Sequence, residues 1–225
     1  FFFVMRLTAE LIERVPQFTN PLKDRELDLR GNKISQIENI GITEDAFDTI
    51  DFSDNEITKL ENFPLFTRLK TVIAHNNRLC RIAPGLGKVL PNLDTLAMHN
   101  NHFKELEELE PLSDLPNLLR LSLCDNLVTK KLNYRLYVIA KCPKLKHLDF
   151  RKVKPRERKQ AEEMFGAATK EKEAAKTFVP GGDVVAEGGM LTEEEQQKIM
   201  QQIEAATSYE EIQKLEERLL AGTGQ

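Results

Sequence analysis

The stretch Leu27-x-Leu29-x-x-Asn32-x-Ile34 decides the fold, because its spacing of apolar residues and asparagine recurs along the chain. The later copies are Ile50-x-Phe52-x-x-Asn55-x-Ile57, Val72-x-Ala74-x-x-Asn77-x-Leu79, Leu96-x-Met98-x-x-Asn101-x-Phe103 and Leu121-x-Leu123-x-x-Asn126-x-Val128. The asparagines are 23, 22, 24 and 25 residues apart, within the roughly 20–29 residues typical of leucine-rich repeats. A sixth copy, Leu145-x-x-Leu148-x-Phe150-x-x-Val153, keeps the apolar spacing without the asparagine.

The alternation of side chains along a strand explains why this spacing predicts a fold. In Leu27-x-Leu29 the two apolar side chains share one face of a short strand, because side chains alternate with a period of two. Stacked copies of this strand bury one continuous core that no single repeat closes alone. The amide of Asn32 and its equivalents has donors and an acceptor, so it can satisfy backbone groups at each bend. We expect an α/β fold, a right-handed leucine-rich-repeat horseshoe with a short parallel β-sheet on its concave side.

Helical patterns at both ends of the repeats predict caps that cover the two ends of the core. Thr8 is the expected N-cap of a helix ahead of the first repeat. Behind the repeats, a helix beginning near Tyr134 ends at Pro143, and Pro155 begins a further helix. The front helix has an apolar face formed by Leu7, Leu11, Val15 and Phe18.

The same signals divide the chain into three parts. Residues 5–165 form the leucine-rich-repeat domain with its capping helices, and residues 166–190 form a glycine-rich linker. Residues 191–221 carry two capping-box patterns and predict a two-helix hairpin. A hairpin of this size has little core of its own, so we expect it to be mobile or to fold against a partner.

Composition limits the class of protein. The 225 residues are 40% hydrophobic and 30% charged with a net charge of −4, a mixture that supports a packed core. No apolar run approaches the roughly 18 residues of a membrane span. The three cysteines are widely spaced and do not suggest a disulfide framework, which indicates a reducing compartment. The phosphate-loop and nucleophile-elbow motifs of common enzymes are absent. We expect a soluble, non-enzymatic chain with no membrane contact and no small-molecule substrate.

Charge is distributed unevenly along the chain. Residues 1–114 carry a net charge of −6, residues 115–159 of +10 and residues 160–225 of −8. A block this basic attracts phosphate or an acidic protein surface. For its most basic part, residues 151–159, three interpretations stay open: contact with phosphate, a nuclear import signal, or the polar face of the rear capping helix.

The outward positions of each strand and its exit form a candidate binding face. Along the repeats they change from acidic, through small and apolar, to basic, and His147 and Arg151 continue the basic end. Such a face suits a helix lying across the sheet, since the concave sides of solenoids are usual binding surfaces. We name the following residues the concave face: Glu26, Asp28, Arg30, Thr49, Asp51, Ser53, Thr71, Ile73, His75, Thr95, Ala97, His99, Arg120 and Ser122.

His75 and His99 occupy equivalent positions in adjacent repeats, which places them about 5 Å apart. Two imidazoles at this distance could share a metal ion. No third ligand of a suitable type aligns with them, so hydrogen bonding to a partner is favoured over metal binding. We expect neither a metal nor a cofactor.

Strings of residues between the leucines carry information beyond the generic repeat. They include Leu7-Thr-Ala-Glu-Leu-Ile-Glu13, Asp24-Arg-Glu-Leu-Asp-Leu-Arg-Gly31, Tyr134-Arg-Leu-Tyr-Val-Ile139, and Leu148-Asp-Phe150 with Lys152-Val-Lys154. Over about residues 5–182 the chain closely resembles the A-prime family of the U2 small nuclear ribonucleoprotein. Generic repeat proteins would share the leucines but not these strings.

The resemblance implies a non-enzymatic scaffold of the spliceosome in the nucleus. In that family the concave sheet binds the first helix of the RNA-recognition-motif domain of the B-double-prime protein. The pair binds stem-loop IV of U2 RNA and supports branch-site recognition in pre-mRNA splicing, and the C-terminal region is expected to contact other spliceosome proteins. In the basic block the candidates for RNA contact are Lys130, Lys131, Arg151, Lys152 and Lys154.

A different class of function stays open from the sequence. A leucine-rich-repeat chain of this kind could also be the regulatory subunit of a phosphatase, or a histone-binding acidic nuclear protein. Co-purification with a phosphatase or with histones, and without U2 RNA, would distinguish this alternative.

Overall fold

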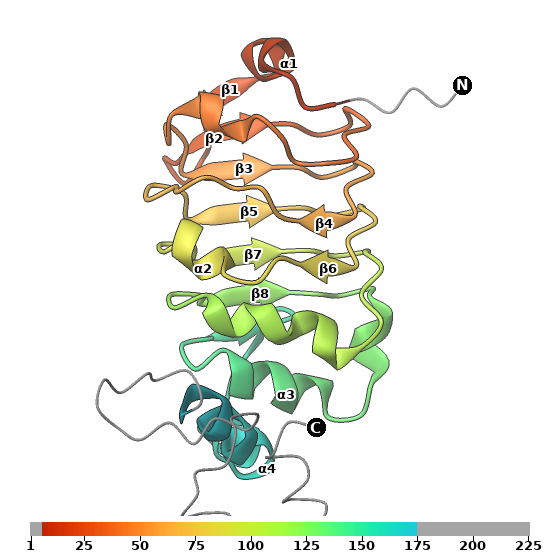
Figure 1. Cartoon of the computed structure of the whole chain (residues 1–225), viewed down its shortest axis with the longest axis vertical. Coiled ribbons are helices and arrows are strands. Elements are labelled where there is room, and N and C mark those ends of the chain that lie inside the picture. Colours follow the sequence, from red (N-terminus) through yellow and green to blue (C-terminus); the bar gives the residue numbers. More distant parts are fainter. Residues whose placement is uncertain (1–5, 175–225) are drawn as a thin grey trace, which may run out of the picture. The chain divides into compact units, whose positions relative to one another are not determined.

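The computed structural model describes residues 6–174, with side chains up to residue 165, and shows a stack of coils closed at both ends (Figure 1). Each coil contributes one short strand to a sheet with the order β1-β2-β3-β5-β7-β8-β9-β10. Strands β2 to β9 pair in parallel, which confirms the predicted leucine-rich-repeat solenoid. The strands are β1 (Gln17–Thr19), β2 (Arg25–Asp28), β3 (Thr49–Asp51), β5 (Thr71–Ile73), β7 (Thr95–Ala97), β8 (Arg120–Ser122), β9 (His147–Leu148) and β10 (Arg151–Lys152).

The inward residues of these strands stack in register from coil to coil. Leu27 lies opposite Ile50, Ile50 opposite Val72, Val72 opposite Leu96, and Leu96 opposite Leu121. All five side chains are buried, with exposed fractions of 3% or less. Burying an aliphatic side chain of this size stabilises the fold by roughly 1.5–3 kcal/mol, so the column provides much of the driving force for stacking.

The asparagine of each inner repeat lies inside the bend and bonds to the preceding coil. The amide of Asn101 donates to the carbonyl oxygens of Ala74 (2.9 Å) and His99 (3.0 Å). Its oxygen accepts from the backbone N–H of Leu79 at 2.9 Å. The equivalent bonds of the other inner repeats are made by Asn55, Asn77 and Asn126. The predicted role of the asparagines is therefore confirmed.

Asn32 differs from the other asparagines because it belongs to the first coil. Its amide donates to the carbonyl of Arg30 in its own coil (3.0 Å), and its side chain is only half-buried. The residue before each asparagine has a left-handed backbone that turns the chain out of the strand, and this position is restricted to types that tolerate that region. These residues are Gly31, Asp54, Asn76, Asn100 and Asp125, with φ between 49° and 70°.

The opposite side of each coil contains short helices and two further strands. The arrows of β4 and β6, which pair in parallel, point opposite to those of β5 and β7 (Figure 1). A Cβ on Gly87 would lie 1.6 Å from the carbonyl oxygen of Asp114, so only glycine allows these coils to pack this closely. The elements are η1 (Ile40–Thr43), β4 (Lys59–Leu60), β6 (Arg81–Ile82), α2 (Leu86–Val89), η2 (Leu106–Asp114) and η3 (Leu127–Lys130).

The N-terminal cap consists of helix α1 (Ala9–Arg14) and strand β1. The hydroxyl of Thr8 accepts from the backbone N–H of Leu11 (3.2 Å), which confirms the predicted N-cap. The prediction that Phe18 continues the helical face is wrong, because Phe18 lies in β1 and is 40% exposed. Val15 precedes a proline and takes an extended backbone, so the helix ends there. The chain then pairs antiparallel with β2.

The C-terminal cap consists of α3 (Tyr134–Lys141) and α4 (Pro155–Ala174), which begins at the predicted proline. Arg135 donates two hydrogen bonds to the carboxylate of Glu157, at 2.7 and 3.3 Å, and ties the two helices together. Because α4 continues to Ala174, residues 166–174, which were predicted to belong to the linker, are part of this helix. The rest of the linker and the predicted hairpin at 191–221 lie outside the described residues.

The sixth copy of the repeat departs from the predicted pattern at Phe150. Its spacing predicts a ring in the core, but the ring is 78% exposed. The backbone is left-handed at Asp149 (φ 50°) and Phe150 (φ 61°), so the chain leaves the ladder after β9 and returns as β10, antiparallel to β9. Arg151 therefore lies on this return strand, not on the parallel ladder as predicted.

The side chain of Asp149 closes the ladder where the chain turns away. In an earlier coil, the backbone N–H of Met98 bonds to the carbonyl of Ser122 on the next strand (2.8 Å). At the last coil, the backbone N–H of Leu123 instead donates to the carboxylate of Asp149 (2.7 Å). A buried N–H without an acceptor would cost about 1–3 kcal/mol, so this carboxylate stabilises the end of the sheet.

Candidate functional site

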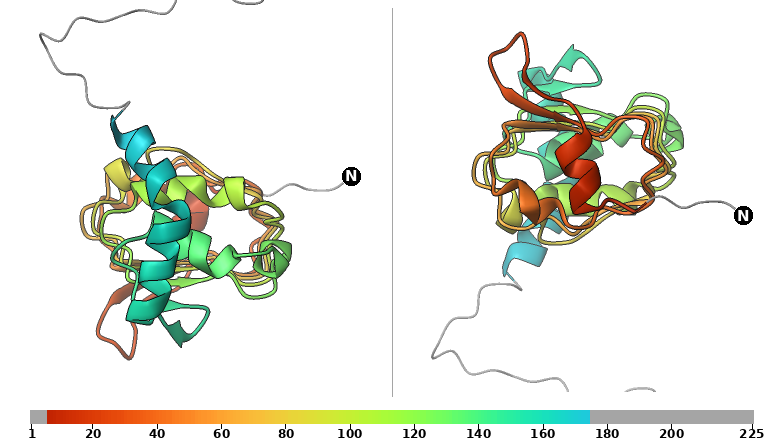
Figure 2. Two further views of the ribbon diagram at one scale, coloured as in Figure 1. Left: turned by 90° about the horizontal axis from the view of Figure 1, so that it is seen from below. Right: turned by 90° about the horizontal axis from the view of Figure 1, so that it is seen from above.

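The concave face lies on the sheet between two hairpins. The β1–β2 hairpin and the β9–β10 hairpin project on the same side of the solenoid, one from each end (Figure 2). Leu22 in the first hairpin is 81% exposed and Phe150 in the second is 78% exposed. Five strand spacings of about 4.8 Å separate β2 from β9, so the trough between the hairpins is about 24 Å long. At 1.5 Å per residue this length fits a helix of about 16 residues.

The residues of the concave face differ in how accessible they are. Four are buried by neighbouring side chains within the chain: Thr49, Asp51, Ser53 and Ser122. The other members are half-buried or exposed and therefore accessible from the concave side: Glu26, Asp28, Arg30, Thr71, Ile73, His75, Thr95, Ala97, His99 and Arg120. The half-buried centre at Thr71, Ile73, Thr95 and Ala97 is small and apolar, as the sequence predicts.

The acidic end of the face is partly neutralised by its own arginine. The guanidinium of Arg30 bonds to the carboxylate of Asp28 at 2.6 Å and lies 3.7 Å from that of Asp51. The hydrogen bond from Arg30 holds the pKa of the Asp28 carboxyl below its ordinary value. Glu26 accepts from the side-chain amide of Asn20 (2.9 Å). The predicted change from acidic to basic is therefore weaker than the sequence alone indicates.

The two histidines stack on one another beside the apolar centre. Their ring centroids are 4.2 Å apart, close to the predicted spacing, and the backbone N–H of His99 donates to Nδ1 of His75 (3.2 Å). Nε2 of His99 also contacts the hydroxyl of Ser122. Burial lowers the pKa of both imidazoles, and the neighbouring His99 lowers that of His75 further. Both rings therefore favour the neutral form and act as flat, weakly polar surfaces.

The basic end of the face is held by side-chain hydrogen bonds. The guanidinium of Arg120 donates to the hydroxyl of Thr95 (2.9 Å) and to the carboxylate of Asp94 (3.1 Å). His147 on β9 is exposed beside it. Arg120 thus lies along β7 and β8 with a fixed orientation and borders the apolar centre.

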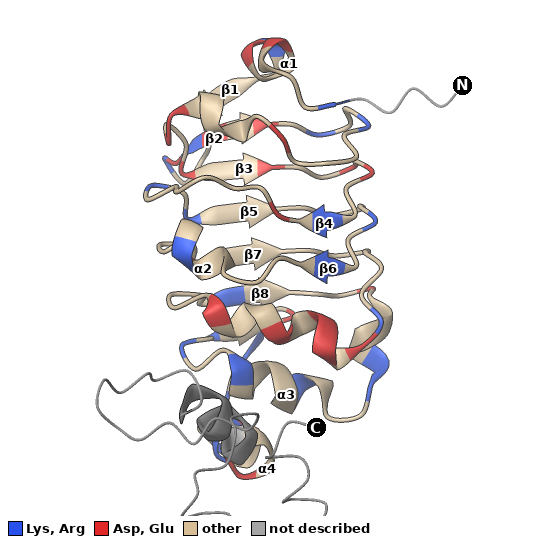
Figure 3. Cartoon of the chain, in the orientation of Figure 1, with Lys and Arg blue, Asp and Glu red and all other residues tan. Residues whose placement is uncertain are grey.

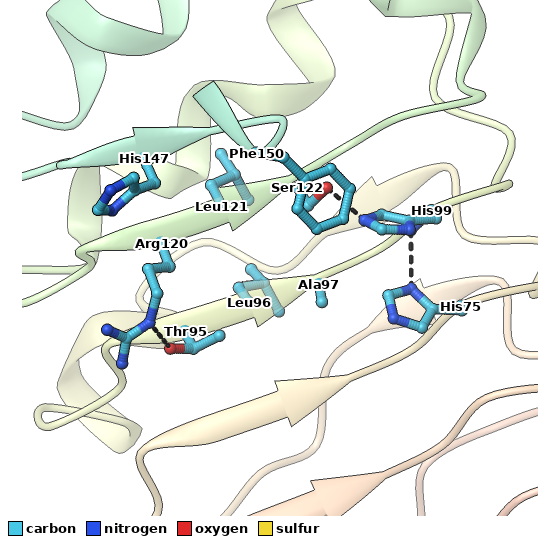
Figure 4. A pocket seen from close by; sticks show the side chains of 10 residues that line it. All are labelled: His75, Thr95, Leu96, Ala97, His99, Arg120, Leu121, Ser122, His147 and Phe150. Atoms are coloured by element: carbon cyan, nitrogen blue, oxygen red, sulfur yellow. Dashed lines mark hydrogen bonds between the residues drawn. The ribbon is translucent and has the colours of Figure 1, made fainter. Parts of the chain in front are cut away.

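Phe150 is the residue of this face that the sequence pattern missed. Its ring lies edge-on to that of His99, with centroids 5.1 Å apart and an interplanar angle of 77°. Together with strands β7 and β8 it lines a pocket of about 390 Å³ on the concave side (Figure 4). The missing asparagine of the sixth copy was the available signal, because a coil without it does not continue the ladder.

The candidates for RNA contact lie on separate elements. Arg151 and Lys152 are exposed on β10, and Lys154 is exposed just before α4. Lys130 ends η3, and Lys131 follows it with its ammonium 2.7 Å from the carboxylate of Glu105. Arg151, Lys152 and Lys154 therefore share the C-terminal cap, whereas Lys131 already has an acidic partner.

Charge on the described surface varies from one coil to the next. Figure 3 shows acidic residues at the ends of β2 and β3 and on η2, and basic residues on β4 and β6.

Within residues 6–174, no group of three His, Cys, Asp or Glu side chains is placed to hold a metal ion. No helix in the same part of the chain has the length and apolar character needed to cross a membrane.

Comparison with known proteins agrees with this architecture. Residues 4–179 match the leucine-rich-repeat family. In the crystal structure of the Drosophila melanogaster SNF/U2A' complex, one chain is 46% identical, with a TM-score of 0.70. The match covers 77% of the present chain and 99% of that chain.

Curated relatives from three distant organisms carry the same name. The U2 small nuclear ribonucleoprotein A' of Homo sapiens is 54% identical over 184 residues, covering 79% of this chain and 72% of that protein. The Arabidopsis thaliana protein of the same name is 54% identical over 173 residues, covering 77% and 70%. The Schizosaccharomyces pombe protein is 43% identical over 235 residues, covering 97% and 98%. The chain therefore belongs to the U2 small nuclear ribonucleoprotein A' family of leucine-rich-repeat proteins.

Proposed function

We propose that the chain is a non-enzymatic scaffold of the U2 small nuclear ribonucleoprotein in the nucleus. Its concave face binds the first helix of the RNA-recognition-motif domain of the B-double-prime protein. The pair then binds stem-loop IV of U2 RNA and supports branch-site recognition in pre-mRNA splicing. Membership of the A' family supports the particle, and the SNF/U2A' complex of a relative supports a protein partner.

The observation that carries the proposal is the accessible apolar centre of the trough. Ile73 and Ala97 lie on adjacent strands and remain half-buried, although the residues beside them on the inner side are fully buried. The two hairpins limit the occupant to something about as long as a four-turn helix. A helix with an apolar stripe satisfies both conditions, since it buries side chains on strands without requiring free strand edges.

RNA contact is proposed for the C-terminal cap. Arg151, Lys152 and Lys154 are exposed there, and Lys130 and Lys131 are the remaining candidates. Lysine and arginine neutralise phosphates and release counterions, so binding should weaken steeply with salt. These few positive charges provide little affinity alone, so the chain binds the stem-loop tightly only together with its partner domain.

Ile73→Arg tests the proposed protein interface. The change places a charge in the apolar centre, and we expect it to weaken binding of the B-double-prime domain at least 30-fold in isothermal titration calorimetry. The matched control is Ile42→Arg, because Ile42 is 47% exposed in η1, outside the sheet. This variant should bind the partner domain like wild type. Both variants should keep the wild-type circular dichroism spectrum. Wild-type binding by folded Ile73→Arg would contradict the proposed interface.

A second experiment tests the joint recognition of RNA. Fluorescence anisotropy with labelled U2 stem-loop IV should show weak binding by this chain alone and tighter binding when the partner domain is added. Tight binding by the chain alone, or no gain from the pair, would contradict the proposal. Recovery of a phosphatase or histones from nuclear extract, without U2 RNA, would favour the alternative function.

A further inference from the structure

The pocket beside Phe150 is a hollow in the concave face. Its floor is formed by β7 and β8, and its volume is about 390 Å³. Phe150 and His99 form one wall, and Arg120 borders the opposite side (Figure 4). Few polar groups point into it, because Arg120 is bonded to Thr95 and His99 contacts Ser122. The interior therefore suits an apolar group.

Phe150 has a conformation that packing of the core does not explain. A bulky residue with φ of 61° is unfavourable, and the ring is nevertheless 78% exposed. The left-handed backbone at Asp149 and Phe150 is the one that the two-residue turn between β9 and β10 requires, and it leaves the ring exposed on the concave side. The edge-on contact with His99 fixes its orientation over the pocket.

Neighbouring groups hold this conformation in the absence of any partner. The carboxylate of Asp149 accepts from the backbone N–H of Leu123 (2.7 Å) and from the hydroxyl of Tyr134 (3.0 Å). The guanidinium of Arg135 donates to the carbonyl of Leu148 before the turn (3.0 Å) and to the carbonyl of Lys152 after it (3.3 Å). The turn is therefore fixed on both sides of Phe150, and the wall of the pocket is preorganised, which reduces the entropy lost on binding.

We propose that Phe150 and the pocket beneath it anchor one large apolar side chain of the partner's helix. The side chain inserts between the ring of Phe150 and the stem of Arg120 and packs on β7 and β8. The rest of the trough then provides complementary shape around this one contact, as expected when a few buried residues carry most of the binding energy. This inference rests on the proposed function of the concave face.

Two substitutions in the full chain test the anchor with the purified B-double-prime domain as the probe. Phe150→Asn removes the ring but suits the left-handed backbone, since asparagine tolerates that region. Ala97→Leu fills the pocket from its floor. We expect each to weaken binding at least tenfold by calorimetry. Leu132→Asn is the matched control, because Leu132 is 86% exposed just before α3 and does not line the pocket. The affinity of this variant should be within twofold of wild type.

A structural role and a binding role give different results for Phe150→Asn. If the ring mattered only for folding, the thermal midpoint would fall together with affinity. We expect the midpoint to stay within about 2 °C of wild type, because loss of the His99 contact is offset by relief of the unfavourable backbone. If the midpoint falls instead, Ala97→Leu and the coupling measurement decide the question.

Coupling to the partner identifies the occupant. Each apolar residue of the partner's helix is changed to alanine, with wild type and with Phe150→Asn. At one position, the change to alanine should lower the affinity for the wild-type chain at least tenfold. The same change should lower the affinity for Phe150→Asn much less. Wild-type affinity for both Phe150→Asn and Ala97→Leu, or losses without coupling to any apolar residue of the helix, would overturn the anchor alone. If the wild-type chain does not bind the domain, the proposed function fails and the anchor fails with it.

Discussion

Replacing Asn101 by leucine tests whether the asparagine ladder holds the coils together. Leucine has a similar size but neither donor nor acceptor, so the change removes three hydrogen bonds without opening a cavity. The backbone N–H of Leu79 and the carbonyl of Ala74 then stay buried without a partner. Each such group costs about 1–3 kcal/mol, so the two together give an expected loss of about 2–6 kcal/mol in the free energy of unfolding. This is a large part of the roughly 5–15 kcal/mol typical of a folded domain.

Asn32→Leu is the matched control at the equivalent position of the first coil. Its amide bonds within its own coil and its side chain is half-buried, so we expect a loss of about 1 kcal/mol or less. Urea denaturation followed by circular dichroism, with midpoints converted through the measured slope, gives both values. Similar losses for the two variants, or a loss below about 1 kcal/mol for Asn101→Leu, would refute the reasoning.

Three further perturbations examine the core, the end of the sheet and the histidines. Leu96→Ala should lower the free energy of unfolding by about 2–5 kcal/mol in urea denaturation, because Leu96 is fully buried between coils; a change below 1 kcal/mol would contradict the inward register. Asp149→Ala should lower the thermal midpoint more than Asp149→Asn, since asparagine keeps an acceptor for the N–H of Leu123; equal effects would argue against that role. Because burial lowers the pKa of His75 and His99, the unfolded chain binds more protons than the folded chain below about pH 6.5. The urea midpoint should therefore fall as pH is lowered from 7.5 to 5, and less so when both histidines are glutamine; an equal fall in that variant would assign it to other groups.

Most of the repeat architecture could be predicted from the sequence. The spacing of Leu96 and Asn101 and their equivalents identified the inward side of every full repeat, because a residue stacked between two coils must be apolar or must satisfy backbone groups. Thr8 and Pro155 marked the starts of the capping helices for the same local reason, since N-cap bonds and proline geometry depend on adjacent residues. The outward positions of the concave face followed from alternation alone.

The two ends of the sheet could not be predicted in this way. Phe18 and Phe150 keep the apolar spacing of their neighbours, yet both are exposed, because in the described part of the chain no further coil stacks against them. The last N–H of the ladder, that of Leu123, donates to the carboxylate of Asp149. These two residues are far apart in sequence, so local pattern does not predict the contact. The charge of the trough is likewise changed by the position of Arg30 between two carboxylates.

The amino-acid sequence by itself therefore determined the coils, their register and the family, because each repeat presents the same local demand for burial and for a satisfied bend. Only the tertiary structure decided the shape of the trough, the exposed ring over its pocket and the partial neutralisation of its acidic end. Those features arise where the repetition stops, and there the favoured arrangement depends on which distant groups meet.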